Sequence, residues 1–309
     1  MTWDPAHLPD QTGRTLAVTG ATAGIGYFAA EQLAAAGAHV VLVSRSATKL
    51  DRARTTLLQH VPSATVSTTV VDLASLASVR EAADELSRLP RLDGIFLNGG
   101  VMSPRRGELT ADGLPVAIGT HVVANVALVA GVLDRLASTA TEHGSTGRIV
   151  HASTGFVRRF ALAPDDALAT PRLLIAAYVK AKTFTEIFAF ELDRRLRAAD
   201  VPVASVVSRP GVGVDANTPQ RAGVRDATTP YRRNPYTPWA QGKDSAAWSA
   251  VRALTDPDAT GGQYYAPTGA LRGLPVRVEP LARTATPDAA TARRVWDQLQ
   301  QLAGVHLPV

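Results

Sequence analysis

The 309-residue chain contains no cysteine. This absence excludes a disulfide framework, thiolate zinc sites, iron–sulfur clusters and cysteine nucleophiles, and we expect no metal site. The first residues lack the basic segment and apolar stretch of a signal peptide. The most apolar window, Val122 to Leu133, is interrupted by Asn125 and is too short to span a bilayer. We therefore expect a cytoplasmic protein without membrane contact.

Aromatic residues are also scarce, at 6% of the chain, which bears on how its charge is interpreted. The net charge is +5 and the pI is about 9.8, values that invite a nucleic-acid interpretation. However, the basic residues are scattered and alternate with acidic ones, as in Arg80-Glu81, and no basic run is interleaved with aromatics. The charge pattern therefore predicts no nucleic-acid partner.

Short β-branched runs alternate with helical stretches along most of the chain. His39 to Val43, for example, is a continuous apolar run typical of a strand buried on both faces. The succession predicts an α/β fold with a doubly wound parallel sheet, the Rossmann arrangement. The expected strands are 16–19, 39–43, 65–71, 94–97, 148–152, 201–207 and 263–266. The expected helices are 25–36, 48–60, 76–89, 116–138, 175–199, 244–254 and 287–302.

One segment departs from this alternation. Residues 211–243 are rich in Pro, Arg, Thr and Gly and show weak periodicity. Loops of this length in compact domains are commonly functional lids or disordered. Because no composition shift marks a boundary, we expect residues 1–309 to form one domain, with 211–243 as a substrate-covering loop.

The turn from Thr19 to Gly26 lies between a predicted strand and a predicted helix. Its sequence is Thr-Gly-Ala-Thr-Ala-Gly-Ile-Gly. Gly20 permits a tight turn, Gly24 lets backbone N–H groups approach a pyrophosphate, and Gly26 allows close helix–sheet packing. A glycine-rich turn alone is weak evidence, but the flanking strand and helix favour a nucleotide site. Its candidate contacts are Gly20, Thr22, Gly24 and Ile25.

The spacing Thr-Gly-x-x-x-Gly-x-Gly resembles that of the short-chain dehydrogenase/reductase family. Other motifs follow in the family's order along nearly the whole chain, and the C-terminal stretch Gly262 to Pro267 resembles the branch containing retinol dehydrogenases and protochlorophyllide reductase. The resemblance implies nucleotide contacts by Asp72-Leu73, Asn98-Gly99 (Gly99 replacing the family's Ala) and Pro210-Gly211, and a Tyr-x-x-x-Lys pair formed by Tyr178 and Lys182.

Tyr178 and Lys182 are four residues apart on a predicted helix and therefore share one face. A nearby ammonium favours phenolate, so we expect Lys182 to lower the pKa of Tyr178 from its reference of about 10. Such a tyrosine exchanges a proton with substrate while a nicotinamide cofactor moves a hydride. The resemblance further implies that Lys182 holds the nicotinamide ribose.

Two positions depart from the family's pattern. The catalytic serine is the second of a pair after the fifth strand, and here that pair is Ser153-Thr154, so the matching residue is Thr154. The family's helix asparagine aligns with His121, or with Thr120 after a one-residue slip; Asn125 lies one turn further on. A histidine there either relays protons or is only a packed helix residue.

The choice of cofactor is predicted from the end of the second strand. NAD-preferring members carry an acidic side chain there, whereas this chain has Ser44-Arg45. A guanidinium can clamp a 2′-phosphate, so NADP(H) is expected; the alternative is a surface arginine.

The resemblance predicts an NADP(H)-dependent ketoreductase of secondary metabolism, acting on a small-molecule carbonyl or the corresponding secondary alcohol. A nucleotide-binding sensor without turnover and a reductase of an activated C=C bond are the alternatives. The sequence leaves a homodimer open. Guanidiniums near a site favour anionic substrates, although solvated surface arginines are the simpler explanation. The arginines concerned are Arg158, Arg159, Arg221, Arg225, Arg232 and Arg233.

Overall fold

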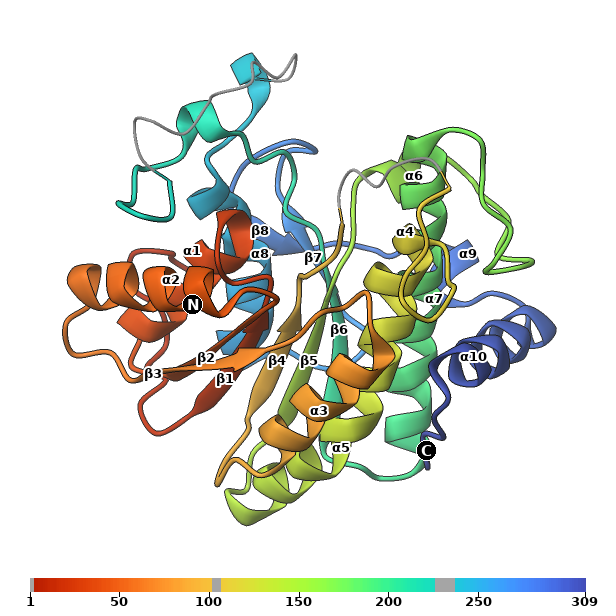
Figure 1. Ribbon diagram of the computed structural model, residues 1–309, viewed down its shortest axis with the longest axis horizontal. Helices are drawn as coiled ribbons and strands as arrows, with labels where there is room; N and C mark the ends of the chain where they lie inside the picture. Colours follow the sequence, from red (N-terminus) through yellow and green to blue (C-terminus); the bar gives the residue numbers. More distant parts are fainter. Residues whose placement is uncertain (1–2, 102–106, 226–236) are drawn as a thin grey trace.

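The computed structural model describes residues 3–101, 107–225 and 237–309. A single eight-stranded sheet in the order β3-β2-β1-β4-β5-β6-β7-β8 runs through the molecule (Figure 1). All neighbouring strands are parallel except β7 and β8. The strands are β1 (Thr15–Thr19), β2 (His39–Ser44), β3 (Val66–Val70), β4 (Gly94–Leu97), β5 (Gly147–Ala152), β6 (Val203–Ser208), β7 (Tyr264–Pro267) and β8 (Pro275–Arg277). The predicted doubly wound sheet is confirmed.

Helices cover both faces of this sheet, as Figure 1 shows. One apolar core lies under α1 (Gly24–Ala35), α2 (Ala47–His60) and α8 (Lys243–Thr255). The other lies under α3 (Leu76–Ser87), α5 (Ala124–Glu142) and α7 (Leu174–Ala198), with α10 (Ala289–Ala303) packed outside α7. The short helices are α4 (Val116–Ile118), α6 (Phe156–Arg159) and α9 (Ala282–Ala285). Three turns complete the described elements: a π-helical turn η1 (Gly119–Val123), and two 3₁₀ turns, η2 (Asp215–Asn217) and η3 (Thr237–Trp239).

The expected helix 116–138 differs from the observed one in two ways. It is interrupted by the π-helical turn η1, and helical structure continues to Glu142. Val116–Glu142 is therefore long and apolar enough to cross a membrane by length and composition, which corrects the expectation that this region is too short. However, 89% of its most apolar window is buried inside the protein, as in the core helix of a globular fold.

The described C-terminal segment contains two elements that the sequence did not predict, β8 and α9. β8 has only three residues and begins at Pro275, and it is ordered by antiparallel pairing with β7. Such a short edge strand has no period that a sequence could reveal. α9 packs against α7, where its Thr284 hydroxyl donates to Glu186.

Candidate active site

The glycine-rich turn between β1 and α1 is shaped by close backbone contacts. Gly20 and Gly24 adopt positive φ values of 68° and 59°. A Cβ on Gly26 would lie 2.4 Å from the carbonyl oxygen of Gly20, so only glycine fits there. No side chain caps α1 at Ala23, which leaves its first N–H groups available to an anion. This geometry fits a dinucleotide pyrophosphate.

Lys243, the first residue of α8, lies beside this turn although the sequence gave no signal for it. Its Nζ is 4.0 Å from the position that a Cβ on Gly24 would take. The same Nζ pairs with Asp215 at 2.6 Å. A phosphate bound at the turn would therefore meet an ammonium group.

Asn98 and Gly99 join the end of β4 to the end of β1. The Thr19 hydroxyl accepts hydrogen bonds from the backbone N–H groups of Asn98 (3.0 Å) and Gly99 (2.8 Å). The Asn98 side chain donates to the Thr19 carbonyl at 3.2 Å. A Cβ on Gly99 would lie only 2.7 Å from the Leu73 side chain, so Gly99 and Leu73 are in close contact. Next to Leu73, the Asp72 carboxylate accepts a hydrogen bond from the backbone N–H of Ala74. These residues surround the end of the glycine-rich turn.

The end of β2 provides the expected ribose position. The Ser44 hydroxyl lies 3.3 Å from that of Thr22 in the glycine-rich turn. Arg45 follows and is exposed, and within the described part of the chain no hydrogen bond or ion pair binds its side chain to the protein. The next residue, Ser46, caps α2 by accepting from Lys49. Arg45 is therefore free to contact a phosphate beside Ser44 and Thr22.

Tyr178, Thr154 and Lys182 meet where β5 ends beside α7. The Thr154 hydroxyl lies near the Tyr178 phenol and acts to lower its pKa. The Lys182 ammonium lies 5.9 Å from the centre of the Tyr178 ring and donates to the Ala152 carbonyl at 2.6 Å. The i, i+4 spacing on α7 thus places the phenol and the ammonium on one face, as the sequence indicated.

The pKa of Tyr178 differs from the sequence-based expectation. Burial raises it to about 12, and the opposing effect comes from the Thr154 hydroxyl, not from the charge of Lys182. Burial also lowers the pKa of Lys182 to about 7, against the charge of Glu186. The protein by itself therefore keeps Tyr178 as a neutral phenol, because loss of water outweighs an ammonium that points to Ala152.

His121 lies against Tyr178, with ring centres 5.2 Å apart and planes at 73°. His121 and the neighbouring Thr120 both belong to the π-helical turn, and Thr120 donates its hydroxyl back to the Val116 carbonyl. The Nε2 of His121 is 3.2 Å from the Val101 carbonyl, and its Nδ1 is buried without a partner in the described part of the chain. Burial and the charge of Lys182 hold the pKa of His121 well below its usual value, so the ring is neutral.

Asn125 supports this turn from α5. Its side-chain N–H donates to the backbone carbonyl of His121, a residue of the π-helical turn, at 2.8 Å. Its Oδ1 is buried and unpartnered among the described residues. Asn125 therefore holds the backbone of His121 and leaves one acceptor unused.

Ser153 points away from Tyr178. Its hydroxyl donates to Glu186 of α7 at 2.5 Å, and Ser153 is fully buried. The Glu186 carboxylate also accepts from Tyr264 (2.8 Å) and Thr284 (2.9 Å), and burial raises its pKa. Glu186 thus ties β5, β7 and α9 together behind the site. Only the i, i+4 spacing from Lys182 could have indicated it.

Pro210 and Gly211 follow β6 at the same edge of the sheet. Gly211 has φ +69°, and a Cβ there would lie 2.4 Å from the Leu271 carbonyl oxygen. The chain then turns across α1 and α2: Arg221 pairs with Glu31 at 2.7 Å, and Thr56 donates to the Ala222 carbonyl.

The described part of the predicted loop, up to residue 225, therefore packs on the nucleotide half of the fold. Arg225 pairs with Asp215 at 3.4 Å. Both Arg221 and Arg225 thus have carboxylate partners and are not free for an anionic substrate. Arg232 and Arg233 lie outside the described residues.

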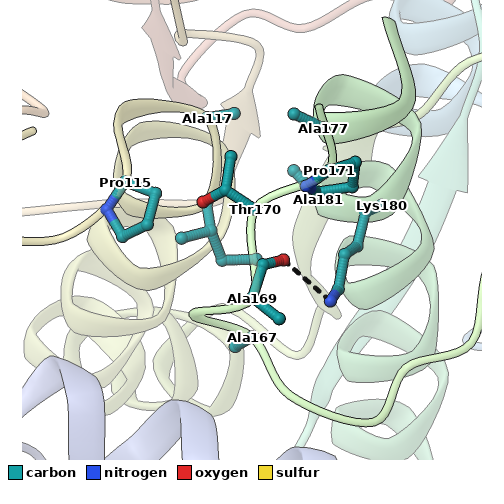
Figure 2. A pocket seen from close by; sticks show the side chains of 10 residues that line it. Pro115, Ala117, Ala167, Ala169, Thr170, Pro171, Ala177, Lys180 and Ala181 are labelled. Atoms are coloured by element: carbon teal, nitrogen blue, oxygen red, sulfur yellow. Dashed lines mark hydrogen bonds between the residues drawn. The ribbon is translucent and has the colours of Figure 1, made fainter. Parts of the chain in front are cut away.

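A small cavity lies between α4, α7 and residues 167–171 (Figure 2). Its volume of about 10 Å³ suits a single water. Figure 2 shows Lys180 reaching across its edge to the Ala169 carbonyl, a hydrogen bond of 2.9 Å. Lys180 therefore holds the segment before α7 in place, on a different face of the helix from Tyr178.

Comparisons with known proteins agree with this geometry. Residues 14–221 match the family model of the short chain dehydrogenases. Over 308 residues the chain is 32% identical to polyprenol dehydrogenase of Mus musculus, covering 97% of this chain and 87% of that protein. Over 319 residues it is 30% identical to the short chain dehydrogenase/reductase dpchH of Colletotrichum higginsianum, covering 96% and 76% respectively. A crystal structure of an uncharacterized protein from Mycobacterium paratuberculosis superposes with a TM-score of 0.78 at 27% identity, each chain covered completely.

Proposed function

Because the chain belongs to the short-chain dehydrogenase family, we propose that it is an NADP(H)-dependent oxidoreductase that interconverts a carbonyl and a secondary alcohol. The meeting of Tyr178, Thr154 and Lys182 at the end of β5 carries the proposal. The relative named polyprenol dehydrogenase supports chemistry at an alcohol carbon. The nicotinamide cofactor supplies or accepts the hydride.

In carbonyl reduction, Tyr178 is the proton donor. Its raised pKa keeps the phenol protonated at neutral pH, which is the form that a developing alkoxide needs. The Thr154 hydroxyl, which lies near the phenol, donates its one proton to the same substrate oxygen and fixes its position. Tyr178 is only partly exposed, which limits the water around these groups.

In this proposal Lys182 and Arg45 bind the cofactor. The Lys182 ammonium lies one helical turn beyond Tyr178, where it can bind ribose hydroxyls while Ala152 fixes its position. Arg45 is exposed beside Ser44, with no carboxylate immediately next to it in the sequence, so it suits the 2′-phosphate that distinguishes NADPH from NADH.

The experiment is to follow NADPH consumption by the purified protein with a panel of ketones and to identify the products. Tyr178→Phe should abolish turnover and leave NADPH affinity nearly unchanged, because the phenol acts on the substrate oxygen. Tyr265→Phe is a matched control, since among the described residues the hydroxyl of Tyr265 bonds to Gln263 and not to the groups around Tyr178. A saturated product that retains its carbonyl would show C=C reduction instead, and NADPH binding without turnover of any ketone would favour a sensor.

A further inference from the structure

Arg209 is a buried cation that the proposed chemistry does not use. It follows β6 directly, and only 8% of its surface is exposed. One hydrogen bond is found for its side chain, a long one of 3.5 Å from Nη1 to the Ala270 carbonyl. Its Nε is buried without a partner among the described residues. Burying a guanidinium with so few acceptors is costly, so its place in the fold calls for a ligand.

The position of Arg209 places that ligand beside the reacting centre. Its Nη1 lies 3.2 Å from the position that a Cβ on Gly155 would take, and Gly155 directly follows Thr154. On its other side Arg209 precedes the Pro210-Gly211 turn. The guanidinium therefore lies at the carboxyl edge of the sheet, between the Thr154 loop and the segment that carries Ala270.

The ionisable groups near Arg209 act on it in both directions. Burial lowers the pKa of Arg209 and the charge of Arg158 acts the same way, whereas Tyr264 and Glu186 raise it. Arg158 and Arg283 donate to backbone carbonyls, those of Glu279 and Val157, and not to carboxylates.

The acidic groups that act on Arg209 from the interior are Tyr264 and Glu186, and Tyr264 donates its hydroxyl to Glu186. The Glu186 carboxylate accepts three hydroxyl hydrogen bonds in all, and burial raises its pKa. Among the described residues no carboxylate is therefore hydrogen-bonded to the Arg209 guanidinium.

We propose that Arg209 binds a carboxylate group of the substrate, so that the substrate class is an oxo acid or the corresponding hydroxy acid. Planar guanidinium and carboxylate groups match in bidentate geometry, and the bond is strengthened in a buried site. A single guanidinium with little exposed surface suits a singly charged carboxylate. The inference rests on the proposed function only for the reaction; the binding of the anion is independent of turnover.

The first test is stability. Arg209→Met keeps an unbranched apolar side chain in place of the arginine stem and removes the charged guanidinium, and we expect it to unfold at the same temperature as the unaltered protein or a higher one. The reason is that an unpartnered buried charge destabilises the fold that holds it. A guanidinium with only a structural role would give a lower unfolding temperature on removal. A variant that failed to fold would overturn the proposal.

The second test is binding, measured by calorimetry on the complex of the protein with NADP⁺. The probes are 4-oxopentanoate and 6-oxoheptanoate, each paired with its methyl ester. The unaltered protein should bind at least one acid about tenfold or more tightly than its ester, the scale of one charge-assisted hydrogen bond. Arg209→Met should abolish this preference and leave ester binding unchanged, and Arg209→Lys should retain part of it.

Arg159→Met is the control, because Arg159 is an exposed arginine at the end of α6, next to Arg158. It should keep the preference for the acid. Equal binding of every acid and its ester by the unaltered protein would overturn the proposal, as would an unchanged preference in Arg209→Met. An acid that is bound through Arg209 but never reduced with NADPH would sustain this inference and refute the proposed function.

Discussion

Removing either of two neighbouring hydroxyls at the end of β5, those of Ser153 and Thr154, should have opposite effects on stability and on activity. The Ser153 hydroxyl donates to the buried Glu186 carboxylate at 2.5 Å, whereas the Thr154 hydroxyl lies near Tyr178 and acts to lower its pKa. Ser153→Ala removes a charge-assisted bond and should cost about 1.5–3 kcal/mol of the free energy of unfolding. At roughly 2 °C per kcal/mol for a chain of this size, the unfolding temperature should fall by about 3–6 °C. Its kcat/KM should stay within about threefold, since no contact with Tyr178 is lost.

For Thr154→Val we expect the reverse, a large loss of activity and a small change in stability. Valine keeps the branched shape and loses the hydroxyl, so kcat/KM should fall about a hundredfold or more, the scale for one donor to a developing oxyanion. Its stability should change by less than about 1 kcal/mol, because the remaining bond, from the N–H of Phe156, is long at 3.3 Å. Thr154→Ser should remain active. Steady-state kinetics and thermal unfolding of the three variants decide the matter; a crippled Ser153→Ala enzyme beside a mild Thr154→Val would refute the assignment.

The remaining predictions concern the cofactor and pH. NADPH should bind at least about tenfold tighter than NADH, and Arg45→Asp should reverse this in fluorescence titrations; equal affinities in the unaltered protein would contradict it. Lys243→Met should weaken NADPH and NADH alike, since its ammonium adjoins the glycine-rich turn and not the ribose; an unchanged affinity would remove it from the site. Because the pKa of Tyr178 is about 12, alcohol oxidation should rise steadily from pH 7 to 10 while carbonyl reduction stays flat, and a plateau near pH 7 would be inconsistent. The pKa of Lys182 is lowered from 10.5 to about 7 in the folded protein, so between these pH values the unfolded chain binds more protons than the folded one. The free energy of unfolding, measured in denaturant titrations, should therefore rise with pH across this window, and it should rise less in Lys182→Met.

Most strands and helices followed from local patterns. The apolar run at His39 to Val43 predicted a strand buried on both faces, and β2 occupies the sheet interior accordingly. The π-helical turn Gly119–Val123 had no such signal, because it depends on backbone hydrogen bonding that side-chain period does not encode. β8 likewise forms only because β7 offers a free edge.

The sequence by itself determined the features that depend on neighbours along the chain: the strand–glycine turn–helix unit at Gly20 to Gly26, and the four-residue spacing of Tyr178 and Lys182. Backbone geometry relates such residues directly, whatever the rest of the molecule does. The resemblance to the family had already pointed to Thr154 and not Ser153, whereas tertiary structure alone raised the pKa of Tyr178 where the sequence suggested lowering. It also brought Arg209 beside the Thr154 loop. These outcomes depend on burial and on contacts between segments far apart in the chain, which no local pattern records.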